Sequence, residues 1–145
     1  MIYLNSQLLT NLKFTAFGYK YDLHFKATHT FLVGDSGVGK TKLFNAINSL
    51  LTINKLKDVV TVNYLTRNPN DLIFTMQRKL IVIDNADVIL TQDLRAHIKC
   101  DQNNMYLIIG RNPKGLLLLP GNVVELHEDN KLITFDHFML RGNIV

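Results

Sequence analysis

The sequence predicts an α/β protein with a mostly parallel central sheet, and three observations support this prediction. An apolar run at residues 31–33 enters a glycine-rich segment, which is followed by apolar residues at helical spacing. A second run, Leu80–Ile83, lacks alternation, which is typical of a strand buried on both faces. Segments with strand and helix character then follow one another along the chain, as expected where helices cover a parallel sheet.

The composition is that of an ordinary folded protein. Hydrophobic residues make up 47% of the 145-residue chain and charged residues 19%, so we expect one domain spanning residues 1–145. The single cysteine, Cys100, excludes an internal disulfide, and no apolar run approaches the roughly 20 residues that cross a bilayer. The N-terminus also lacks the pattern of a secretory signal. We therefore expect a cytoplasmic protein without membrane contact.

The charge balance gives only weak support for a nucleic-acid partner. Sixteen lysines and arginines stand against 12 aspartates and glutamates, for a net charge of +4. The basic residues are scattered along the chain, whereas proteins that bind nucleic acid usually gather such charge on one face.

Before the glycine-rich segment the residues have strand character. Phe17, Tyr19, Tyr21, Leu23 and Phe25 alternate with polar or small residues, a period of two. We expect a half-buried strand that pairs antiparallel with an earlier strand containing residues 8–14. The aromatic side chains would cover the sheet, and the alternative is that they face an adenine ring.

The remainder of the chain yields a regular succession of elements. Apolar residues recur at helical spacing from Leu43 to Leu51 and predict a helix directly after the glycine-rich segment. A strand is expected next, at residues 59–65, and then a helix that begins near Pro69, where residues 68–71 supply a turn and the helix cap. The strand Leu80–Ile83, an amphipathic helix at residues 88–100 and the strand Met105–Ile109 follow. The last expected element is a hairpin of residues 123–127 and 131–138 about a turn at residues 128–130.

The glycine-rich segment has the full phosphate-binding pattern, Gly34-x-x-x-x-Gly39-Lys40-Thr41. Phosphates require backbone N–H groups and a helix N-terminus at close range, and glycines remove the side chains that would block this approach. The lysine would reach the β- and γ-phosphate oxygens, and the threonine hydroxyl would hold Mg²⁺. The alternative is a glycine-rich turn between a strand and a helix. The residues assigned to nucleotide binding are Gly34, Asp35, Ser36, Gly37, Val38, Gly39, Lys40, Thr41 and Lys42.

Thr41 is the first candidate ligand for Mg²⁺, and Asp84 is the second. It directly follows the buried run Leu80–Ile83, and parallel sheets place their ligands at the carboxyl ends of the strands. Asp84 would therefore lie beside the phosphate loop and bind the metal directly or through water. The alternative is a strand that ends in a capping aspartate.

Together these two motifs resemble those of the P-loop NTPases. The apolar strand expected at residues 59–65 resembles the additional-strand division, which includes AAA+, ABC-type and STAND ATPases, and no single family within it is identified. The resemblance covers residues 28–113. It implies a three-layer core around a sheet ordered 5-1-4-3-2, extended here by N-terminal antiparallel strands and a C-terminal hairpin, and it implies ATP and Mg²⁺ as cofactors. It also implies a polar residue near the γ-phosphate, where Arg111 falls; the alternative is a surface turn residue.

The residue after Asp84 departs from the common pattern of these ATPases. Many have glutamate there to polarise the attacking water, whereas this chain has Asn85, which can orient water and cannot take its proton. Asp87 is the nearest replacement base, and its alternative role is to cap the following helix. The candidate catalytic residues are Lys40, Asp84, Asn85, Asp87 and Arg111.

These features predict a slow or partner-activated ATPase. The absence of the guanine-reading Asn-Lys-x-Asp pattern favours an adenine nucleotide. The competing hypothesis is a nucleotide-dependent switch for a protein or nucleic-acid partner with little hydrolysis, and small-molecule phosphotransfer is a weaker third. A homo-oligomer or a protein partner could supply a residue that raises turnover.

Overall fold

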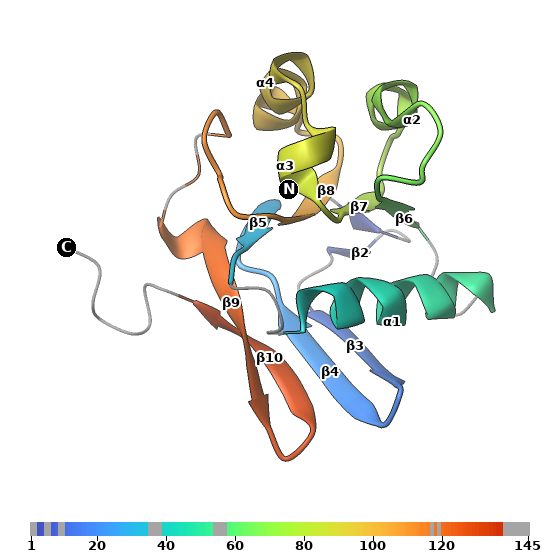
Figure 1. The fold of residues 1–145 in the computed structure, drawn as a ribbon, viewed down its shortest axis with the longest axis vertical. Coiled ribbons are helices and arrows are strands. Elements are labelled where there is room, and N and C mark those ends of the chain that lie inside the picture. Colours follow the sequence, from blue (N-terminus) through green and yellow to red (C-terminus); the bar gives the residue numbers. More distant parts are fainter. Residues whose placement is uncertain are drawn as a thin grey trace.

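An eight-stranded sheet forms the framework of the protein (Figure 1). The computed structural model describes residues 3–4, 7–8, 11–34, 39–53, 58–116, 118 and 120–137. Its sheet order is β3-β4-β10-β9-β5-β8-β7-β6, and the sheet is mixed. A separate pair of short strands, β1 (Tyr3–Leu4) and β2 (Gln7–Leu8), precedes it. The chain is therefore α/β, as predicted.

Five neighbouring strands of this sheet run parallel to one another. They are, across the sheet, β9 (Val123–Asp129), β5 (His29–Leu32), β8 (Met105–Ile109), β7 (Leu80–Ile83) and β6 (Val59–Val62). Numbered along the chain from β5, they have the order 5-1-4-3-2. Every residue of β7 and β8 is buried, which explains why their sequences are uninterrupted apolar runs.

The other three strands form a curled extension of the same sheet. β3 (Asn11–Ala16) and β4 (Tyr19–His24) make an antiparallel hairpin, and β10 (Leu132–His137) runs parallel to β4 and antiparallel to β9. The predicted N-terminal and C-terminal strand pairs are therefore both present, and they are joined through β4 and β10. The sheet is consequently mixed rather than parallel throughout.

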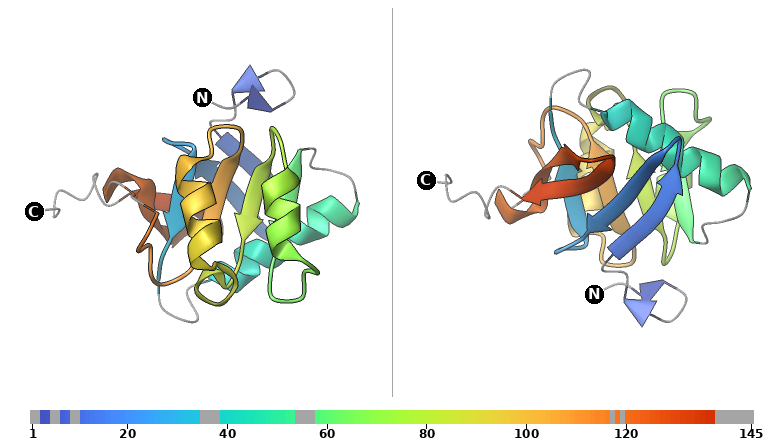
Figure 2. Two further views of the ribbon diagram at one scale, coloured as in Figure 1. Left: turned by 90° about the horizontal axis from the view of Figure 1, so that it is seen from above. Right: turned by 90° about the horizontal axis from the view of Figure 1, so that it is seen from below.

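Helices cover both faces of the parallel strands (Figure 2). On one face, α1 (Lys40–Thr52) shares a core with the curled extension, where Leu43 and Ile47 join Leu23 and Phe135. On the other face, three shorter helices pack on residues of β5, β7 and β8. They are α2 (Pro69–Thr75), α3 (Ala86–Ile89) and α4 (Gln92–Cys100). Within the described residues, no helix has the length and apolar character needed to span a membrane.

Four local predictions require correction. The expected helix at residues 88–100 is two helices, because the Thr91 hydroxyl accepts a hydrogen bond from the Leu94 N–H and starts α4 anew. Phe17 is 61% exposed in the β3–β4 turn, where its φ is 53° and that of Gly18 is 80°. The strand expected at residues 59–65 ends at Val62.

The fourth correction concerns the closing hairpin. Its turn is Asn130–Lys131, with φ of 50° and 62°, rather than residues 128–130, and β9 extends to Asp129. The predicted final residue of this hairpin, Phe138, lies outside the described residues.

Candidate functional site

The candidate loop leaves β5 at the carboxyl end of the parallel strands and ends in the first turn of α1. Gly34 has φ of 144° and Gly39 has φ of 94°, and L side chains rarely adopt either conformation. Gly39 stands directly before α1, and its carbonyl accepts a hydrogen bond from the Leu43 N–H at 2.9 Å. The predicted nucleotide-binding residues Asp35, Ser36, Gly37 and Val38 lie outside the described residues.

The Lys40 side chain reaches back to Gly34. Its ammonium donates a hydrogen bond to the Gly34 carbonyl oxygen at 2.5 Å, and the residue is half-buried. The next two predicted site residues, Thr41 and Lys42, have different surroundings from Lys40. Thr41 is exposed in the first turn of α1, and the Lys42 ammonium lies over the Tyr19 ring of β4, 3.5 Å from the ring centroid.

The aromatic side chains of β4, and Phe25 just beyond its end, are engaged within the protein. Tyr21 stacks on Phe14 with ring centroids 4.6 Å apart, and Phe25 contacts Phe135 edge to face at 5.4 Å. These rings cover the curled extension, as the primary interpretation of the alternating pattern expects, rather than standing open toward a ligand.

Asp84 lies one residue beyond β7 and is buried, with only 8% of the residue exposed. The carboxylate accepts a hydrogen bond from the Asn85 N–H at 2.9 Å, and the Asp84 N–H donates to the Val62 carbonyl at the end of β6. Burial raises the pKa of Asp84, and the Asn85 N–H and the positive charge of Lys40 oppose this rise in pKa. Lys40 is therefore near enough for its charge to lower the pKa of Asp84, 44 positions later in the sequence.

The two candidates for placing water have different surroundings. Asn85 is exposed, with φ of 53°, immediately before α3. The Asp87 carboxylate accepts hydrogen bonds from the N–H groups of Arg111, at 2.8 Å, and Asn112, at 3.0 Å. Arg95 of α4 lies 4.0 Å from the same carboxylate. Asp87 therefore ties α3 to the loop after β8, and the Arg111 side chain is exposed on that loop.

Sequence reasoning missed two residues that shape this loop. At Gly110 a Cβ atom would lie 3.2 Å from Phe31 Cζ and 3.3 Å from Asp87 Oδ1, so the end of β8 approaches its neighbours closely. The guanidinium of Arg95 donates to the carbonyl oxygens of Asn112 and Lys114 at 3.1 and 2.7 Å. The glycine at the end of an apolar strand was a usable signal for the close approach, whereas nothing in the sequence indicates the carbonyl acceptors of Arg95.

The side chains near the loop suit a metal ion that is held mainly by the phosphate oxygens of a bound nucleotide and by water. Among the described residues, no three His, Cys, Asp or Glu side chains come together as a metal site. Mg²⁺ bound with a nucleotide commonly uses one or two protein oxygens together with phosphate oxygens and water, and Asp84 and Thr41 offer one carboxylate and one hydroxyl. The single buried carboxylate beside Lys40 fits that mode.

Comparison with known proteins provides no family for this chain. No protein-family model matches the sequence, and a search of curated proteins found no match. The geometry of the loop and of Asp84 is therefore the basis for the functional argument.

Proposed function

We propose that this chain binds Mg·ATP in the loop between β5 and α1 and is a slow or partner-activated ATPase. One observation carries the proposal: a phosphate-loop sequence joins β5 to α1, with Lys40 hydrogen-bonded to the Gly34 carbonyl, and the buried Asp84 directly follows β7, a parallel strand of the same sheet. A lysine for phosphates and a carboxylate for a metal are the two charges that a magnesium nucleotide requires in one place. The strand order supports the same proposal.

Each residue has a distinct part in this account. Lys40 exchanges the Gly34 carbonyl for phosphate oxygens, because an ammonium forms a stronger hydrogen bond with an anionic oxygen than with a neutral one. Thr41 and Asp84 would hold Mg²⁺, which when bound neutralises phosphate charge. The backbone of residues 35–41, whose N–H groups a phosphate loop uses, completes the proposed cradle.

The surroundings of Asp87 support slow turnover by the isolated protein. Both of its oxygens accept backbone hydrogen bonds, so abstracting a proton from water would compete with holding the Arg111 loop. Asn85 can orient water and cannot act as a base. A second copy of the chain or another protein that supplies a polar residue would raise the rate.

The hydrogen bonds of Asp87 favour a second candidate function, a nucleotide-dependent switch. The Asp87 hydrogen bonds link the Arg111 loop to α3, which begins two residues after Asp84. Occupation of the nucleotide site would bias this loop without requiring hydrolysis, and the loop would present Arg111 to a protein or nucleic-acid partner. Small-molecule phosphotransfer is the weakest candidate, because no acceptor is identified.

Steady-state ATP turnover at several protein concentrations separates these functions. Lys40→Ala is the test variant, and Lys13→Ala, which removes an exposed lysine from β3, is the matched control. Turnover that rises faster than linearly with protein concentration, persists in Lys13→Ala and is lost in Lys40→Ala supports an ATPase activated by assembly. Nucleotide binding without turnover at any concentration supports the switch, and the absence of nucleotide binding contradicts both.

A further inference from the structure

A second concave site lies beside the Arg111 loop, and Asp87 of α3 is part of its lining. It is a cleft of about 370 Å³ between α4 and residues 112–115. Its lining includes Gln92, Arg95 and Lys99 of α4, together with Asn112 and Lys114 of the loop. Leu90 and Ala96 supply apolar surface. The cleft therefore has the size and mixed lining of a pocket for a small molecule.

The cleft carries an excess of positive charge. Arg95, Lys99 and Lys114 face one acidic residue, Asp87, whose carboxylate already accepts two backbone hydrogen bonds. Within the part of the chain that the structure describes, no hydrogen bond or ion pair engages the Lys99 or Lys114 ammonium. These two ammonium groups are available to a ligand.

Arg95 gives the cleft a fixed cation. Its side chain is only 15% exposed, and its guanidinium is held by the Asn112 and Lys114 carbonyl oxygens. Arg95 and Lys99 are four residues apart on α4 and so lie on the same side of the helix. One positive charge is thus anchored in the wall, 4.0 Å from the Asp87 carboxylate, and two exposed ammonium groups can contact an anion.

We propose that this cleft binds a small organic phosphate and that its occupation stabilises the Arg111 loop. The phosphate would be held by Lys99 and Lys114 in the field of Arg95, and the organic part would contact Leu90 and Ala96. A nucleic-acid backbone would instead need cations along an extended track. This binding does not depend on the proposed nucleotide site.

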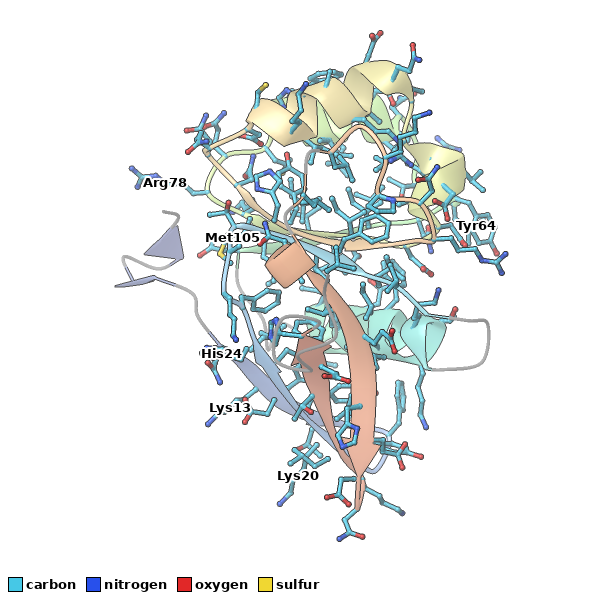
Figure 3. All side chains as sticks on the ribbon, turned by 90° about the vertical axis from the view of Figure 1, so that its left-hand side faces the viewer. Lys13, Lys20, His24, Tyr64, Arg78 and Met105 are labelled. Atoms are coloured by element: carbon cyan, nitrogen blue, oxygen red, sulfur yellow. The ribbon has the colours of Figure 1, made fainter. Side chains whose placement is uncertain are left out.

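Pyrophosphate binding, measured by calorimetry, tests the inference in the Lys40→Ala background, in which the proposed phosphate loop competes less for the ligand. The test variant adds Lys99→Ala and Lys114→Ala. The control adds Lys13→Ala and Lys20→Ala instead, which removes the same charge from the β3–β4 hairpin, far from α4 (Figure 3). We expect the test variant to bind about a hundredfold more weakly, about tenfold for each lost charge-assisted contact, and the control to bind within about threefold of its parent.

Two further measurements complete the test. Pyrophosphate should slow hydrogen exchange of the Arg111 and Asn112 amides in the Lys40→Ala protein, because the ligand anchors their loop. Equal pyrophosphate binding by the two triple variants, or no binding by the Lys40→Ala protein, would overturn the assignment. A short single-stranded oligonucleotide provides the last test. If it binds more tightly than pyrophosphate and loses its binding in the variant with Lys99→Ala and Lys114→Ala, the proposal that the ligand is a small organic phosphate is overturned.

Discussion

The Asp87 carboxylate accepts a hydrogen bond from the Arg111 N–H at 2.8 Å, across 24 positions of sequence. A second bond from the Asn112 N–H, at 3.0 Å, engages its other oxygen. Asp87 follows β7, and Arg111 follows β8, so these two bonds fix the carboxyl ends of two adjacent parallel strands relative to each other. The loop that carries Arg111 is thereby held beside α3, which begins two residues after Asp84.

Replacing Asp87 with alanine should loosen this loop. The substitution leaves two backbone N–H groups without their carboxylate acceptor, and we expect a loss of about 1–3 kcal/mol in the free energy of unfolding. Denaturant titration measures that loss, and hydrogen exchange should show faster exchange at the Arg111 and Asn112 amides. Asp129→Ala, on the exposed end of β9, is the control and should change stability by less than about 0.5 kcal/mol. Unchanged exchange at both amides would contradict the role of Asp87.

Asp84 should make the ligand-free protein less stable at neutral pH. Because burial raises its pKa in the folded state, the folded protein binds the proton more tightly than the unfolded chain. The unfavourable contribution is absent below the ordinary aspartate pKa and develops as pH rises through that value to the raised one. Asp84→Asn should therefore be more stable than the wild type at neutral pH, and this advantage should disappear in acid.

Thermal unfolding of the wild type and Asp84→Asn, from neutral to acidic pH, checks the direction of this stability difference. Asn can accept the same hydrogen bond from the Asn85 N–H, so the comparison isolates the charge. The same substitution should weaken Mg²⁺-dependent nucleotide binding, which would identify Asp84 as a site where stability is given up for function. A variant less stable than the wild type at neutral pH would show that the Asp84 charge stabilises the fold instead.

Tyr106 and Asp101 form a buried polar pair at the opposite end of the strands. Tyr106 Oη donates to Asp101 Oδ2 at 2.6 Å, and Asn104 Nδ2 donates to the same oxygen at 2.8 Å. Burial raises the pKa of Asp101, and the hydrogen bonds from Tyr106, Asn104 and the Asn103 N–H, aided by His97, outweigh burial and leave that pKa below its usual value. We expect Tyr106→Phe to reduce the free energy of unfolding at neutral pH by about 1–3 kcal/mol.

The pH dependence distinguishes this hydrogen bond from simple packing. A lowered folded-state pKa contributes stability above the ordinary aspartate pKa, and this stability is lost as pH falls toward the lowered value. Without the tyrosine hydroxyl the pKa of Asp101 should rise, so the gap between wild type and Tyr106→Phe should narrow in acid. A gap that stays constant from neutral to acidic pH, in denaturant titrations, would assign the loss to packing.

Several elements were predictable from local sequence because one local signal dominates each of them. β8 has the predicted bounds Met105–Ile109, and β7 the bounds Leu80–Ile83, since apolar runs without alternation suit strands covered on both faces. α2 begins at Pro69, a residue whose fixed φ suits the first helical turn.

Other features depend on contacts that local patterns do not encode. The parallel pairing of β4 with β10 joins Tyr21 to Ile133, and no local pattern indicates which strand will lie beside β4. The Thr91 cap that divides α3 from α4 competes with a continuous apolar periodicity. In the site, the loop and Asp84 were identifiable as motifs, whereas the engagement of Asp87 by two distant amides required the fold.

Equilibrium binding of ATP tests the central claim most directly. Calorimetry would compare the wild type, Lys40→Ala and Lys13→Ala, each with and without Mg²⁺. We predict that the wild type and Lys13→Ala bind ATP alike and more tightly with Mg²⁺, and that Lys40→Ala binds at least about tenfold more weakly. Equal ATP binding by Lys40→Ala and Lys13→Ala, or no binding by the wild type, would contradict a nucleotide site at this loop.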